Sequence, residues 1–357
     1  MNVLVRSRHF WLVLAAGAAV GVFGGLLSFW GNPQNSGICV SCFIENSSGA
    51  LGLHSNQRMQ YLRPELIGFV LGSLLCAVGF REFASRGGSA PLARLVAGIF
   101  LIVGSAVFIG CPIKLFLRLG AGDLSALSGV FGLVAGVWLG LQSLARGIDL
   151  GRSHSERGGG GLWVPTLFVL LLLFLLVRPA FIAFSERGSA AQHAPLLLSL
   201  GAGLLLGALA QRSRFCITGS LRDSLLMGRR SPLFWGFIAF LAGVVATSLL
   251  TGQFRYGLYG QPGAHVDYVW SFLGMLLVGW LSTLIGGCPF RQLVKAGEGD
   301  TDAGLVVIGM LLGGGLVQTW GIAATAAGVE LPGKVAVLTG LAFIILLSLF
   351  SRERAPG

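Results

Sequence analysis

Charged residues are scarce in this sequence. Asp, Glu, Lys and Arg together make up 11% of the 357 residues, whereas hydrophobic residues make up 54%. A soluble domain would need far more polar surface to cover that many apolar side chains. The composition, with a mean hydropathy of +0.80, therefore excludes an ordinary soluble protein and indicates that lipid solvates much of the surface.

Motifs of enzymes and metal proteins are also lacking. No Walker motif, Rossmann fingerprint, G-x-S-x-G or H-E-x-x-H pattern occurs in a suitable context, which excludes ATP-driven pumping by this chain alone. A zinc site needs four ligands, and neither a second C-x-x-C nor a histidine pair is present. The net charge of +11 is scattered between apolar runs, which argues against a nucleic-acid partner. We therefore expect no enzyme activity, no metal and no cofactor.

Long uncharged runs are what the sequence has in abundance. Runs such as Leu124 to Ala145 and Pro232 to Gly252 reach the roughly 20 residues that a helix needs to cross a bilayer. The sequence predicts an all-α polytopic membrane protein whose first run is a retained span rather than a cleaved signal. The ten predicted spans lie at about 10–30, 64–80, 91–110, 124–145, 162–184, 194–210, 232–252, 268–287, 303–325 and 335–350.

The distribution of basic residues predicts an orientation. Most of the 25 lysines and arginines fall in alternate loops, and they lie on the cytoplasmic side if the N-terminus does. The predicted spans then also place the C-terminus in the cytoplasm. We expect both termini to be cytoplasmic.

One segment of the sequence occurs twice. Gly110 to Asp123 reads GCPIKLFLRLGAGD, and Gly287 to Asp300 reads GCPFRQLVKAGEGD. The offset between them, 287 − 110 = 177 residues, also carries Cys39 onto Cys216. Such a shared offset predicts a duplication, with halves at 1–150 and 191–357 and a cytoplasmic loop and linking span at 151–190.

The odd span between the halves predicts that they have opposite orientations in the membrane. In such an inverted repeat, Cys39 and Cys111 approach from outside, while Cys216 and Cys288 approach from inside. This is the plan of many transporters.

Both Gly-Cys-Pro sequences predict a broken helix. Proline cannot donate a backbone hydrogen bond and disfavours helical geometry in the preceding residue. Non-helical backbone persists at membrane depth only where protein or a water-filled cavity satisfies it, so each break marks a candidate binding site. The alternative is a simple helix–loop–helix at the membrane interface.

The cysteines at these breaks are candidate substrate-binding residues. Nearby basic side chains can stabilise a thiolate or attract an anion, although cysteine is also often buried as a small hydrophobe. The predicted substrate path comprises Cys39, Cys111, Cys216, Cys288, Lys114, Arg214 and Arg291.

Five further residues are secondary candidates. Cys42 forms C-x-x-C with Cys39, for which a reversible disulfide is an alternative. Asp123 and Asp300 are expected to cap the helices that follow, with ion coupling as the lesser alternative. The basic residues Arg118 and Lys295 complete this set.

Several motifs together resemble the YeeE/YedE family of membrane proteins, and most closely its YedE-like branch, which is linked to selenium metabolism. They are GICVSCF, GALGLH, YLRPELIGFVLGS, REF followed by RGGSAPL, both Gly-Cys-Pro segments and RFCITGSLRD. The resemblance implies a bacterial inner-membrane protein. Relatives include thiosulfate uptake proteins in which cysteines along an hourglass-shaped path contact the anion. The resemblance also implies a small cytoplasmic sulfur-carrier protein as a partner.

Three functions are compatible with these features. The first is a permease for a small sulfur or selenium compound, such as thiosulfate or a selenium oxyanion. The second is a membrane-embedded sulfur or selenium transferase that forms a persulfide on Cys39 or Cys111. The third is a scaffold that binds a carrier protein through the basic segment Arg212 to Arg230.

Overall fold

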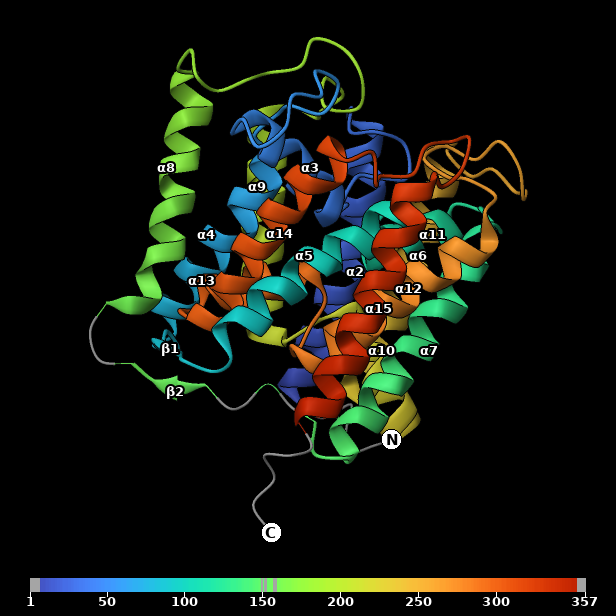
Figure 1. Ribbon diagram of the computed structural model, residues 1–357. Helices are drawn as coiled ribbons and strands as arrows, with labels where there is room; N and C mark the ends of the chain where they lie inside the picture. The colour runs from blue at the N-terminus through green and yellow to red at the C-terminus, as the bar shows by residue number, and fades with distance from the viewer. Residues whose placement is uncertain (1–6, 149, 151–152, 157–158, 352–357) are drawn as a thin grey trace.

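The computed structural model describes residues 7–148, 150, 153–156 and 159–351. Both chain ends, 1–6 and 352–357, lie outside the described residues, so the prediction for the termini is not tested on them. Nearly all regular structure is helical (Figure 1). The all-α polytopic class predicted from composition is confirmed.

The helices follow one another in the same order in both halves. In the first half they are α2 (Arg8–Phe29), α3 (Val40–Ala50), α4 (Pro64–Gly79), α5 (Pro91–Phe108), α6 (Pro112–Gly120) and α7 (Ala126–Ala145). In the second half they are α9 (Leu196–Ser213), α10 (Ile217–Met227), α11 (Pro232–Leu250), α12 (Tyr268–Leu284), α13 (Pro289–Gly297) and α14 (Thr301–Thr319).

Two more long helices and four minor elements complete the described structure. Helix α8 (Trp163–Val177) connects the halves and stands at one side of the bundle, and α15 (Leu331–Ser351) follows the second half (Figure 1). The minor elements are the 3-10 turns η1 (Gly160–Leu162) and η2 (Gly228–Arg230) and a two-residue antiparallel pairing of β1 (Arg86–Gly87) with β2 (His154–Ser155).

Nine helical segments in the described part of the chain are long and apolar enough to cross a membrane. The tenth predicted span, at about 64–80, forms α4, which is apolar but has only 16 residues. It begins at Pro64, as predicted, directly after the buried Arg63, whose guanidinium group donates to the carbonyl oxygens of Gln192 and Ser189.

The backbone breaks where Gly-Cys-Pro predicts it. Helix α5 ends at Phe108 and α6 begins at Pro112, just as α12 ends at Leu284 and α13 begins at Pro289. The connections use left-handed backbone, with φ of 61° at Ile109 and 80° at Gly286. Each proline occupies the first turn of its short helix, where a missing N–H costs nothing.

The two halves pack against each other reciprocally. Helix α4 packs on α9 as α11 packs on α2, and α7 packs on α12 as α14 packs on α5. The loops repeat this exchange, since the Ala84 N–H donates to Glu298 O (3.1 Å) and the Arg255 N–H donates to Ala121 O (2.8 Å). Each half therefore completes the packing of the other.

Glycine permits this close packing. A Cβ atom on Gly207 of α9 would lie 2.3 Å from the Phe69 carbonyl oxygen of α4, and one on Gly136 of α7 would lie 2.1 Å from Leu276 O of α12. Because lipid provides no hydrophobic force between helices, such backbone contact is a main source of helix association.

We predict that Gly207→Ala destabilises the protein by about 1–3 kcal/mol, because the added methyl group overpacks the α4–α9 contact. Gly201→Ala is the matched control on the same helix, where nothing lies within 4 Å of an added Cβ. Thermal unfolding in detergent compares the two variants. Equal unfolding temperatures for them would contradict the role given to Gly207.

Candidate functional site

Each of the four repeated cysteines caps a short helix. Cys39 precedes α3, Cys111 precedes α6, Cys216 precedes α10 and Cys288 precedes α13. All four side chains are buried. The first turn of a helix has backbone N–H groups without intrahelical partners and carries partial positive charge. The structure therefore places four thiols at four electropositive helix starts.

Cys216 and Cys288 form one pair, which we call the inner pair after the predicted orientation. Their sulfur atoms lie 3.4 Å apart. Cys216 Sγ also accepts hydrogen bonds from the backbone N–H groups of Gly219 (3.5 Å) and Cys288 (3.4 Å). The Thr218 hydroxyl oxygen lies 3.3 Å from the same sulfur. Two helix starts and a hydroxyl thus converge on one thiol.

The outer pair repeats this geometry. Cys39 Sγ accepts a hydrogen bond from the Cys42 N–H (3.4 Å) and lies 3.5 Å from Ser41 Oγ. Ser41 and Cys42 occupy the positions that Thr218 and Gly219 occupy beside Cys216. Cys111 is the partner of Cys39 by the offset of the repeat, because 111 + 177 = 288. All six cysteines of the chain are free thiols, so the C-x-x-C pair is not a disulfide in this structure.

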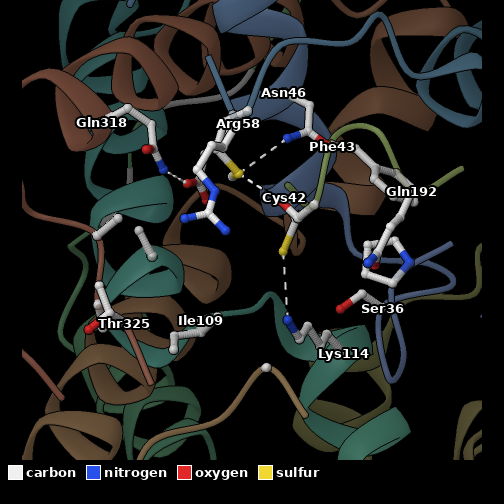
Figure 2. A pocket seen from close by; sticks show the side chains of 18 of the residues that line it. Ser36, Cys42, Phe43, Asn46, Arg58, Ile109, Lys114, Gln192, Gln318 and Thr325 are labelled. Carbon is white, nitrogen blue, oxygen red and sulfur yellow. Dashed lines mark hydrogen bonds between the residues drawn. The ribbon is translucent and has the colours of Figure 1, made fainter. Parts of the chain in front are cut away.

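A cavity of about 610 Å³ opens beside the outer pair. Cys42 and Lys114 line it, and the Lys114 ammonium group lies 3.9 Å from Cys42 Sγ (Figure 2). Glu45, Arg58 and Gln318 also line this cavity. We call it the outer cavity, after the predicted orientation.

A smaller cavity of about 180 Å³ lies beside the inner pair. Its lining includes Cys216 and Thr218 together with three arginines, Arg214, Arg222 and Arg291. We call it the inner cavity. The helices that border the two cavities, α3 and α10, lie toward opposite ends of the bundle (Figure 1).

The two cavities use equivalent positions of the repeat. Lys114 in the outer cavity corresponds to Arg291 in the inner one, because 114 + 177 = 291. By the same offset Cys42 corresponds to Gly219, and Glu45 corresponds to Arg222. The first equivalence preserves a cation, whereas the last exchanges an acid for a base.

Two of the three arginines of the inner cavity are held by a buried acid. Glu298 forms ion pairs with Arg214 (2.7 Å), Arg291 (3.0 Å) and Arg86 (3.1 Å). Sequence reasoning missed Glu298, although it lies inside the repeated motif. Its three partners come from separate segments, so only the tertiary structure shows the cluster.

Four of the five secondary candidates lie away from the two cavities, whereas Cys42 lines the outer one. Arg118 pairs with Asp123 (2.7 Å), and Lys295 pairs with Asp300 (3.3 Å). None of these four side chains lines either cavity. Asp300 caps α14 through the Ala303 N–H, as predicted.

Asp123 differs from the prediction that it caps the next helix. It accepts hydrogen bonds from the Ser125 N–H and hydroxyl, and Ser125 itself is the residue that precedes α7. Two residues, Leu124 and Ser125, lie between Asp123 and the first residue of α7, so Asp123 does not occupy the N-cap position of that helix.

A comparison with known families finds a match over part of this chain. Residues 212–351 match a family described as sulphur transport. This part of the chain is similar to that family. The resemblance to YeeE/YedE proteins drawn from the motifs is thereby confirmed.

A curated relative gives the same result. The thiosulfate transporter TsuA of Escherichia coli (strain K12) is 29% identical to this chain over 104 residues. This alignment covers 29% of the chain and 29% of the length of TsuA.

We predict that Cys42 is the thiol most open to reagents in the outer cavity. It is partly exposed there, whereas Cys39 is 0% and Cys111 is 1% exposed. In a Cys76→Ser background, which removes the partly exposed thiol of α4, a membrane-impermeant maleimide should modify Cys42 well before the other two. Peptide mass spectrometry measures the three rates, and equal rates would contradict the placement of these thiols.

Proposed function

We propose that the chain is a permease of the bacterial inner membrane that moves a small sulfur-containing anion along a path lined by the repeated cysteines. The observation that carries this proposal is the convergence of four cysteine-capped helix starts between two cavities that contain cations. Helix N-termini favour anions, and discontinuous helices form the binding sites of many transporters. The relationship to TsuA supports the same substrate class.

The proposal includes an inverted repeat of residues 1–150 and 191–357, joined by 151–190. The reciprocal helix packing and the placement of α3 and α10 toward opposite ends of the bundle support it. The start of α2 and the end of α15 lie at the same end of the bundle, near α10 (Figure 1). This placement supports the proposal that both termini are cytoplasmic and that the outer cavity faces the periplasm.

An anion would first meet Lys114 in the outer cavity. It would then accept hydrogen bonds from the thiols and backbone N–H groups at Cys39 and Cys111, and next from those at Cys216 and Cys288. Arg291 and Arg214 would receive it in the inner cavity. Thiol hydrogen bonds are weak, and passage requires contacts weak enough to be released. Because the four sulfur atoms are buried, passage also requires these helix starts to separate locally.

Thiosulfate and selenium oxyanions both fit this chemistry as small anions that accept several hydrogen bonds. A soft terminal sulfur atom gives thiosulfate an additional contact with thiols, so we propose thiosulfate as the first substrate to test. A cytoplasmic sulfur-carrier protein would dock on the inner surface, where Arg229 and Arg230 of η2 are exposed and basic.

Uptake into proteoliposomes tests the permease and the cysteine path. We expect labelled thiosulfate to enter vesicles that contain the wild-type protein. Replacement of all four repeated cysteines by serine should reduce uptake at least about tenfold, which corresponds to about 1.4 kcal/mol. Cys76→Ser is the control, because Cys76 lines neither cavity.

Other outcomes would contradict the proposal in distinct ways. Absence of uptake for both thiosulfate and selenium oxyanions would contradict the permease. Full uptake by the four-serine variant would contradict the cysteine path. A covalent sulfur adduct on Cys39 or Cys111, seen by intact mass after exposure to substrate, would instead indicate the transferase.

A further inference from the structure

Glu45 differs from most buried acids of this protein because it lacks a basic partner. In the described part of the chain, four buried carboxylates form ion pairs with lysine or arginine: Asp123, Glu298, Asp300 and Asp302. Glu65 has no ion pair either, but it accepts hydrogen bonds from Asn32 and Ser199 and lines neither cavity. Glu45 is 5% exposed and lines the outer cavity.

Its single side-chain hydrogen bond comes from a neutral amide. Gln318 Nε2 donates to Glu45 Oε2 (2.6 Å), and Gln318 Oε1 accepts from Asn56 Nδ2 (2.8 Å). The second bond fixes the orientation of the amide, so Gln318 presents its donor to Glu45. Among the described residues, Glu45 Oε1 has no hydrogen-bond partner and is free to hold a proton. Burial of an unpaired carboxylate favours its neutral form.

The charged and titratable groups around Glu45 come from several elements. They are Cys39 before α3, Cys42 on α3, His54 and Arg58 in the loop that follows, Arg63 before α4, and Lys114 on α6. None of the basic groups lies within ion-pair distance of Glu45 in the described structure. Glu45 lies on α3, which is not one of the candidate membrane spans. Burial raises the pKa of Glu45 to about 7.

We propose that Glu45 is a proton-binding site whose protonation is coupled to anion binding in the outer cavity. Cys42 and Glu45 lie three residues apart on α3 and therefore on one face of that helix, toward Lys114. An anion held near Lys114 would share a poorly solvated cavity with a Glu45 carboxylate, and two negative charges there repel strongly. Uptake of one proton from the external solution by the Glu45 carboxylate removes this repulsion.

The inner cavity lacks such a proton site at the equivalent position. Arg222 stands there, and its guanidinium group remains charged at all relevant pH values. The proton site proposed at Glu45 therefore has no counterpart at the equivalent position of the inner cavity. The exchange of Glu45 for Arg222 therefore makes the outer and inner cavities functionally different.

The sign of the pH dependence follows from linkage. The protonated form binds the anion, so affinity is greatest below the pKa of Glu45 and falls as pH rises above it. For a pKa of about 7 and one proton, the dissociation constant rises about tenfold between about pH 6 and about pH 8.

Calorimetric titration of the purified protein with thiosulfate tests the coupling. The coupling proposal rests on the proposed function only for the choice of anion. Buffers of different ionisation enthalpy report the proton taken up on binding. We expect proton uptake near pH 7 for the wild-type protein, and for Glu45→Gln we expect neither proton uptake nor the tenfold change in affinity. Glu186→Gln, which changes an exposed carboxyl outside the outer cavity, is the control and should behave as wild type.

A pH-dependent affinity that persists in Glu45→Gln would overturn the proposal. Infrared difference spectroscopy provides a readout without substrate, because the carboxylic C=O band that appears between about pH 8 and about pH 6 should lose one component in Glu45→Gln. An unchanged band in a Glu45→Gln protein that elutes as wild type would also overturn it. Failure of wild-type protein to bind thiosulfate, with the band difference intact, would instead contradict the proposed substrate.

Discussion

The structure depends on one constraint, which is that backbone N–H groups inside a membrane must find partners. Four short helices begin within the bundle, and each exposes unpaired N–H groups at its first turn. The protein places a cysteine at every one of these starts, and the sulfur atoms of Cys39 and Cys216 accept backbone hydrogen bonds. A weak acceptor leaves these groups available to a stronger one, and in the proposed function the transported anion is that acceptor.

The rest of the fold holds these helix starts in place. Glycines let the helices of the two halves approach until backbones touch, as at Gly207 and Phe69. Buried ion pairs fix the far ends of the short helices, with Asp123 on Arg118 after α6 and Asp300 on Lys295 after α13. These pairs explain why charge recurs at equivalent positions away from the cavities. They position the short helices, whereas Lys114 and Arg291 line the two cavities.

The sequence predicted features that repeat or are local. Proline chemistry predicted both breaks, and the shared offset of 177 residues predicted that Cys39 and Cys216 hold the same local position. Features that depend on distant segments were not predictable. Glu298 meets arginines from three different segments, and Glu45 is distinguished by the absence of a partner, which no local pattern reveals. The burial of Arg63 against carbonyl groups of the segment at 189–192 is another such feature.

The central claim is that the cysteine-capped helix starts bind the transported anion. A crystal structure of the protein soaked with a selenium-containing anion tests it most directly, because anomalous scattering locates selenium without ambiguity. The account predicts anomalous density beside Cys39 and Cys111 or beside Cys216 and Cys288. Density that is confined to sites away from all four cysteines would contradict it.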